Sequence, residues 1–220
     1  MAPELSIGSQ LTTLLASAML VVQLLMVAQR QLLTSIRLFA LQSLFLAGIA
    51  TVNGFLHHAP HVYFLAALTV AGKVVFLPWF LRRLVRRIAI DLEMRPWINP
   101  STSMLLCGAA TLLGYLVARP FTAAAGGANT FGVAMALVLT GFFMLINRRR
   151  AITQVLALLC VENGLFLAAL SLTERGMPLV VELGIFFDVM VAVMVLGILV
   201  YRIRESFASM DTSKLNQLKG

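Results

Sequence analysis

The sequence predicts an all-α integral membrane protein with about seven transmembrane helices. The chain of 220 residues is 60% hydrophobic and only 12% charged, and it contains several apolar runs long enough to cross a hydrocarbon core about 30 Å thick. The basic residues stand mostly at the ends of these runs, where they orient a membrane protein. The formal net charge of +8 therefore reflects topology rather than nucleic-acid binding, and no separate globular domain is expected.

Each predicted span is a helix, because lipid offers no water to unpaired backbone groups. The first apolar run, residues 11–28, is expected to be a retained span and not a cleaved signal peptide. Pro96, Pro100 and Pro120 are expected to mark loops, and residues 126–129 a turn. The predicted spans, of which the fourth and fifth are short, cover residues 5–28, 36–55, 62–81, 103–118, 131–146, 152–172 and 178–201.

The distribution of Lys and Arg predicts an N-terminus outside and a C-terminus inside the membrane. In this orientation only Arg119 and Arg175 lie outside. Six spans would place the charges of one half on the wrong side, so the bias supports an odd number. The residues expected inside are Arg30, Arg37, Arg82, Arg83, Arg86, Arg87, Arg95, Arg148, Arg149, Arg150, Arg202, Arg204, Lys214 and Lys219.

The two halves of the chain carry a short internal echo. Residues 43–47 (SLFLA) follow a basic turn, as residues 164–168 (GLFLA) do, and each segment lies in the second helix of a set of three. Both sets would run from outside to inside, with the fourth span returning the chain between them. This pattern indicates a parallel three-helix repeat. The alternative is coincidence, because Leu, Phe and Ala are common in membrane helices.

Four ionisable residues lie well inside the apolar segments: Lys73, Glu162, Glu182 and Asp188. A central Asp or Lys costs roughly 2.5 to 3.5 kcal/mol, so such residues face protein or a water-filled cavity. At about 1.5 Å per residue, Lys73, Glu162 and Asp188 fall near the middle of their spans. Glu182 lies about 9 Å nearer the outer surface and points roughly 120° away from Asp188.

Two interpretations of these residues stay open. Buried polar groups can hold helices together by hydrogen bonds. Three groups of mixed sign at one depth favour a polar axis that carries protons or other cations, because burial opposes ionisation of a carboxyl and a nearby ammonium favours it. Pro78 follows Lys73 by five residues and is expected to disturb backbone hydrogen bonds around Lys73, for binding or for a packing kink.

The sequence contains no strong metal or cofactor motif. His57, His58 and His61 cluster near the outer end of a predicted hairpin, but no Cys or carboxylate completes a metal site. Cys107 and Cys160 lie in apolar segments and are expected to pack in the core. The chain itself is therefore expected to bind no cofactor and to do no redox chemistry.

The second half of the chain resembles a known subunit type. Residues 145–150 (LINRRR), residues 161–164 (VENG) and a last acidic helix ending in Tyr201 and Arg202 are similar in order to the three-helix K-type subunit of respiratory complex I. Over its whole length, and especially in residues 176–188 (GMPLVVELGIFFD), the chain resembles the hydrogenase-4 component E family, which adds helices before a K-type half.

This resemblance implies a membrane-arm subunit of a group 4 [NiFe] hydrogenase or formate hydrogenlyase-type assembly in a bacterial or archaeal cytoplasmic membrane. The nickel–iron centre and iron–sulfur clusters would lie in partner subunits, beside antiporter-like and H-type-like membrane partners. The family's proton-path acids fall on Glu162 and Asp188, the second being Glu in the K-type pattern, and Lys73 would tune them or serve an earlier segment. Glu182 would serve an outward branch or a subunit interface.

The resemblance also predicts the organisation of the chain. A three-helix unit would cover residues 1–90, a basic loop and linking helix 91–124, a K-type-like unit 125–204, and a cytoplasmic tail 205–220. Two rival functions remain: a component of a multi-subunit cation/proton antiporter, whose K-type subunits usually have only three helices, and a structural scaffold whose acids join helices.

Overall fold

The computed structural model describes residues 3–56, 60–87, 96–124 and 130–172, together with positions 191 and 195. The chain divides into two units, Met1–Gly184 and Ile185–Gly220, and every helix discussed below belongs to the first. In chain order the elements are α1 (Pro3–Ala28), α2 (Leu32–Leu56), α3 (Pro60–Thr69), the π-helix η1 (Val70–Phe76), α4 (Leu77–Arg87), α5 (Pro100–Ala124), α6 (Thr130–Asn147) and α7 (Ala151–Leu172).

The protein is an all-α membrane protein, as predicted. Six described stretches are long and apolar enough to cross a membrane, and they correspond to the first six predicted spans. The predicted seventh span, 178–201, lies outside the described residues apart from two positions. The six stretches are Ile7–Ala28, Leu32–Leu56, Val62–Arg83, Pro100–Phe121, Thr130–Asn147 and Ile152–Leu172.

The prediction for the fourth span was wrong in its length. Helix α5 has 25 residues and contains Pro120, which was expected to mark a loop. A proline inside a helix removes one backbone hydrogen bond and crowds the preceding turn, but apolar contacts can keep the helix going. Here Phe121 meets Phe131 of α6 edge to face, with ring centroids 5.5 Å apart. Pro100 is the first residue of α5, a position where proline costs no hydrogen bond.

The third span contains the backbone irregularity expected near Pro78. Between α3 and α4 the helix widens into the π-helix η1, and the Leu77 N–H bonds to the carbonyl of Gly72, five residues back. Proline lacks an N–H and clashes with the carbonyl four residues earlier, so a wider turn accommodates it. Lys73 lies within this π segment. The helix continues to Arg87, beyond the predicted end at residue 81.

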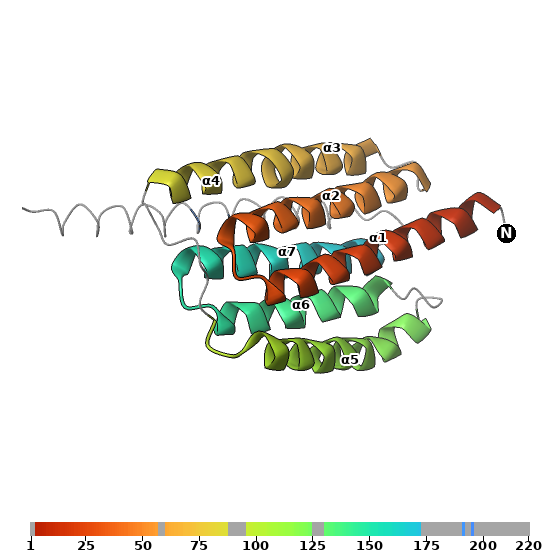
Figure 1. The fold of residues 1–220 in the computed structure, drawn as a ribbon. Helices are drawn as coiled ribbons and strands as arrows, with labels where there is room; N and C mark the ends of the chain where they lie inside the picture. Colours follow the sequence, from red (N-terminus) through yellow and green to blue (C-terminus); the bar gives the residue numbers. More distant parts are fainter. Residues whose placement is uncertain are drawn as a thin grey trace, which may run out of the picture. The chain divides into compact units, whose positions relative to one another are not determined.

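Two helical hairpins form the centre of the bundle. Hairpin α1–α2 packs beside hairpin α6–α7, with α1 against α6 and α2 against α7. Figure 1 shows that α1 and α6 run in the same direction and that α5 returns the chain between the two sets. The described helices therefore have the relative directions that the parallel repeat predicts.

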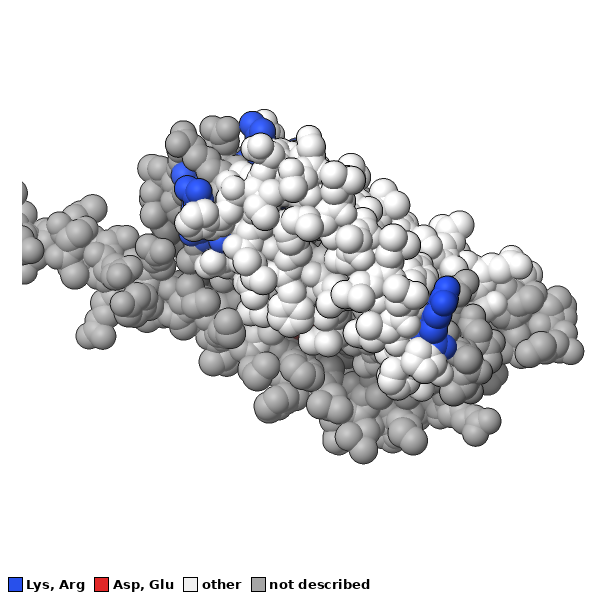
Figure 2. Space-filling view, turned by 90° about the horizontal axis from the view of Figure 1, so that it is seen from below, with Lys and Arg blue, Asp and Glu red and all other residues white. Residues whose placement is uncertain are grey.

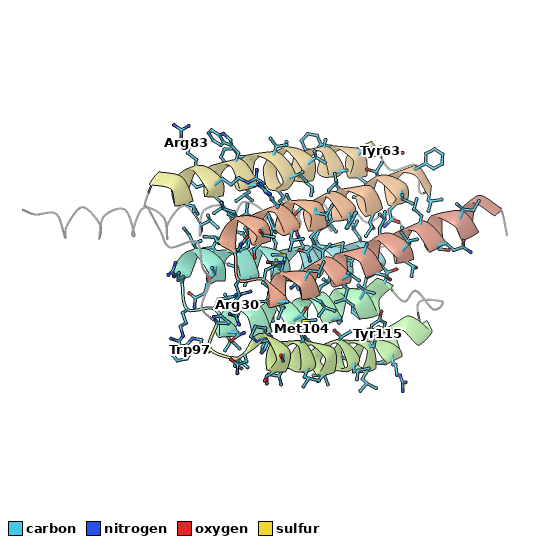
Figure 3. All side chains as sticks on the ribbon, in the orientation of Figure 1. Arg30, Tyr63, Arg83, Trp97, Met104 and Tyr115 are labelled. Carbon is cyan, nitrogen blue, oxygen red and sulfur yellow. The ribbon has the colours of Figure 1, made fainter. Side chains whose placement is uncertain are left out.

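Basic residues gather at the ends of the bundle and leave its length apolar. In Figure 2 the blue groups lie at the two extremes of the visible face and white side chains fill the space between them. Figure 3 places Arg30, Arg83 and Trp97 toward the same end, where α1 and α4 finish and α5 begins, and Tyr63 toward the other. This is the charge pattern of a bundle with an apolar belt between two polar ends.

Candidate functional site

A buried ion pair joins the first half of the chain to the second. The Lys73 Nζ lies 2.9 Å from the Glu162 Oε1, and both side chains are 5% exposed. Lys73 comes from η1 and Glu162 from the middle of α7. A buried charged group normally requires a partner of opposite charge, and Lys73 and Glu162 are partners of this kind for each other. The sequence placed both residues at one depth; the structure shows that they meet.

A row of neutral polar side chains continues from this pair across the bundle. Lys73 Nζ donates to Asn163 Oδ1 at 3.2 Å. Asn163 Nδ2 donates to Gln42 Oε1 at 3.2 Å and to Ser43 Oγ at 3.1 Å. Gln42 Nε2 then donates to Gln23 Oε1 at 2.7 Å. We call Asn163, Gln42 and Gln23 the amide ladder.

The amide ladder is as deeply buried as a hydrophobic core. Gln23, Gln42, Ser43 and Asn163 are each 0% exposed. They come from α1, α2 and α7, so together with η1 the polar cluster connects four elements. Phe166, one turn after Glu162, closes the cluster with its ring centroid 5.9 Å from Lys73 Nζ, within the range of a cation–π contact.

Sequence reasoning missed the amide ladder. Its signal was present, because Gln and Asn in the middle of apolar runs are also costly to bury without partners. Asn163 even stands next to Glu162, inside the segment used for the family resemblance. Extending the internal echo by one residue aligns Gln42 with Asn163, and these two amides bond to each other. The contact between equivalent positions supports the repeat.

A second buried cation, Arg148, ties the two hairpins together at their turns. The sequence pattern predicts only a topological role for Arg148, yet this residue is 3% exposed. Its Nη2 donates to the carbonyls of Met26, Val27 and Gln29 at 2.8, 3.2 and 3.2 Å. Met26 and Val27 lie in the last turn of α1 and Gln29 directly follows it. Carbonyls at a helix C-terminus have no partner within the helix, so the guanidinium caps α1. Burial lowers the pKa of Arg148, but a guanidinium remains charged in proteins.

The residues beside Arg148 fasten the start of α5. Asn147 Oδ1 accepts from the Ile98 N–H at 3.0 Å, and its Nδ2 donates to Ser103 Oγ at 3.2 Å. Arg149 lies over the ring of Trp97 with its Cζ 3.9 Å from the centroid. The basic turn between α6 and α7 therefore binds both the end of α1 and the start of α5.

Other predicted site residues are only partly described. Glu182 and Asp188 lie outside the described residues, as do His57 and His58, and nothing is described of the His61 side chain.

Cys107 and Cys160 are buried, and Cys160 Sγ lies 3.9 Å from Met26 Sδ, in agreement with core packing. Within the described part of the chain, no three His, Cys, Asp or Glu residues lie together as a metal site would require.

Comparison with known proteins finds relatives along nearly the whole chain. An uncharacterized protein of Mycobacterium tuberculosis is 32% identical over 207 residues, which are 93% of this chain and 94% of that protein. Hydrogenase-4 component E of Escherichia coli K12 is 27% identical over 215 residues, 97% of this chain and 99% of that protein. The protein of that name from Shigella flexneri gives the same values. No protein-family model and no solved structure matches the chain.

Proposed function

Because the chain belongs to the hydrogenase-4 component E family, we propose that it is a membrane subunit of a hydrogenase complex, in which the Lys73–Glu162 pair takes part in moving protons or other cations. The observation that carries this proposal is the 2.9 Å contact between two oppositely charged side chains that are 5% exposed. A buried carboxylate beside an ammonium changes charge state with small changes of its surroundings. Such a group suits a step in cation transfer.

The chemistry assigned to the pair is proton exchange. Glu162 accepts a proton when its ion pair with Lys73 loosens and releases it when the ammonium returns. A membrane potential contributes about 2.3 kcal/mol per charge per 100 mV, so the work must come from partner subunits. In this proposal those partners are complex I-like membrane subunits and peripheral subunits that hold the nickel–iron centre and iron–sulfur clusters.

Asp188 and Glu182 complete the proposal for the path. Asp188 is proposed to be a second proton-exchanging group in the last span, and its shorter side chain would use a bridging water. Glu182 is proposed to lie on an outward branch or at a subunit interface. The chain is proposed to lie in a bacterial or archaeal cytoplasmic membrane, with the end that carries Arg30, Arg83 and Arg148 inside.

A structural scaffold is the second candidate. The observation that favours it is the hydrogen-bonded cluster itself, which joins α1, α2, α7 and η1 and would hold helices together without moving any ion. A third candidate, a subunit of a cation/proton antiporter, uses the same pair for exchange without hydrogenase partners. The two tests below separate these functions.

Glu162→Gln and Asp188→Asn are the deciding variants, each studied in the complete complex purified in mild detergent and returned to vesicles. Glu162→Gln keeps the side-chain shape and leaves an amide oxygen to accept from Lys73. We expect the complex to assemble and hydrogenase turnover to persist, while proton movement coupled to turnover falls at least tenfold. A pH-sensitive dye inside the vesicles measures that movement.

Leu41→Gln is the matched control, because it introduces the same side chain at the equivalent position of the first hairpin, where the residue is 39% exposed. It should leave proton movement unchanged. Unchanged movement in both test variants would reject the relay, and loss of assembly alone would favour the scaffold. Copurification without a nickel–iron subunit would favour the antiporter.

A further inference from the structure

We propose that the amide ladder of Asn163, Gln42 and Gln23 holds the protonated Lys73, because all three amides point their oxygens toward the ammonium. In this proposal Asn163 keeps the ammonium in place while Glu162 is neutral. This inference rests on the function proposed for the Lys73–Glu162 pair and adds positioning residues to it. Its basis is a continuous row of hydrogen bonds from Lys73 Nζ through Asn163 and Gln42 to Gln23, and all four residues are 0% to 4% exposed.

The direction of every hydrogen bond in the ladder follows from its charged end. An ammonium only donates, so the oxygen of Asn163 must face Lys73. The amide nitrogen of Asn163 then faces the oxygen of Gln42, and the nitrogen of Gln42 faces the oxygen of Gln23. Each amide therefore presents its negative end toward the cation and its positive end away from it. Such aligned bonds strengthen one another in a buried site.

Ser43 provides a second acceptor for the Asn163 amide. Asn163 has two amide hydrogens, and they go to Gln42 Oε1 at 3.2 Å and to Ser43 Oγ at 3.1 Å. Both acceptors are on α2, in adjacent positions. The Asn163 oxygen is thereby aimed at Lys73 without dependence on Glu162, although the two residues are neighbours on α7.

The free end of the ladder agrees with this assignment. Gln23 accepts through Oε1, so its Nε2 must point onward, and this atom is buried with no hydrogen-bond partner among the described residues. A reversed ladder would still leave one Gln23 amide atom at the far end and would turn the N–H groups of Asn163 toward the ammonium. The observed direction is the one that favours a charged Lys73.

The consequence appears when Glu162 takes up a proton. The carboxyl then loses its charge, and the ammonium loses its strongest partner while Asn163 Oδ1 remains 3.2 Å away. The ladder thus gives the cation a second, neutral contact that is independent of the proton being exchanged. The titratable groups that the structure describes beside Lys73 are Glu162 and Cys160, both from α7, and the ladder itself does not titrate.

The test compares proton movement per hydrogen turned over, in vesicles that hold the assembled complex. Asn163→Leu removes the acceptor at similar volume, and we expect proton movement per hydrogen to fall severalfold in the fully assembled complex, because the ammonium has lost the contact that holds it while Glu162 is neutral. Gln42→Leu leaves that contact but ends the ladder early, so a smaller loss is expected.

The swap Gln42→Asn with Asn163→Gln provides the rescue, since it keeps both amides and their combined length. A return toward the wild-type value supports the ladder. Wild-type values in Asn163→Leu and Gln42→Leu, with lower assembly as the only change, would overturn it and leave a structural role. If Glu162→Gln also leaves proton movement unchanged, the proposed function fails as well; if Glu162→Gln abolishes movement, only the ladder fails.

Discussion

The two central hairpins share a motif and differ in one decisive residue. Residues 42–47 of α2 and 163–168 of α7 align as QSLFLA and NGLFLA, and each motif begins with a buried amide. The preceding residue is Leu41 in the first hairpin, 39% exposed, and Glu162 in the second, 4% exposed. One repeat thus presents hydrocarbon outward where the other carries a carboxylate inward.

The difference shows how a repeated helical unit acquires an ionisable site. The amides Gln42 and Asn163 bond to each other between the hairpins, so both repeats contribute to the same polar centre. Only α7 adds a negative charge, and only there does Lys73 arrive from η1 to neutralise it. The neutral hairpin supplies structure to the cluster and the acidic one supplies the charge that can change.

The largest expected effect comes from leaving one charge of the pair alone. Lys73→Met removes the ammonium and keeps the apolar stem, so Glu162 stays buried without its cation. Breaking a buried pair in this way costs about 3–5 kcal/mol. We expect a much lower melting temperature in detergent, or loss of the subunit from the complex, measured by thermal unfolding and by copurification.

The double change Lys73→Met with Glu162→Leu sharpens the comparison, because it gives the second hairpin the residue found at Leu41. It should recover most of the stability lost in Lys73→Met, as apolar replacements of buried pairs often do, while proton movement stays absent. If the double variant were as unstable as Lys73→Met, the unpaired charge of Glu162 would not be the cause of the lost stability.

The second effect concerns the turns of the two hairpins. Arg148 caps α1 through three carbonyls, whereas Arg37, near the start of α2, is exposed. Hydrogen bonds to charged groups contribute about 1.5–3 kcal/mol each, with less than additive totals. Arg148→Met should therefore destabilise the protein by about 2–3 kcal/mol, and Arg37→Met should have little effect in the same thermal measurement. Equal effects would deny Arg148 its capping role.

Sequence alone predicted the helices and the depth of the charges because both follow from one-dimensional quantities. Lipid forces apolar runs into helices, and the rise per residue places Lys73 and Glu162 near mid-span. Whether those two meet depends on which helices are neighbours, and periodicity carries no such information. The ladder was missed because Gln and Asn cost less to bury than charges, and Arg148 because a basic residue at a helix end already had a topological explanation.

At Pro120 the prediction from sequence was wrong, because a local stop signal did not end the helix. A proline after an arginine at the end of an apolar run is a reasonable stop signal, yet α5 continues through it to Ala124. Phe121, the next residue, packs edge to face on Phe131, and the two residues lie on either side of the segment that links α5 to α6. The local stop signal at Pro120 does not show such a contact with another helix.

The third effect concerns the space available at equivalent positions of the two hairpins. Gly164 aligns with Ser43, and a Cβ at Gly164 would lie 2.9 Å from Val138 Cγ2 and 3.0 Å from the Val138 backbone nitrogen. Gly164→Ser gives the second hairpin the residue of the first and should destabilise it by about 1–3 kcal/mol through overpacking of α6 on α7. Gly108→Ser is the control, because a Cβ there meets nothing within 4 Å.

The smallest effect tests the surface of the same basic turn. Arg149 stacks on Trp97 with a separation of 3.9 Å, but Trp97 is 66% exposed, and cation–π contacts at exposed sites contribute about 0.5–1 kcal/mol. Arg149→Ala should lower stability by no more than that, measured beside Arg148→Met. Adjacent arginines would then differ severalfold because one guanidinium is buried against helix carbonyls and the other is solvated. A loss as large as that of Arg148→Met would show that the stack of Arg149 on Trp97 contributes as much to stability as the buried cap does.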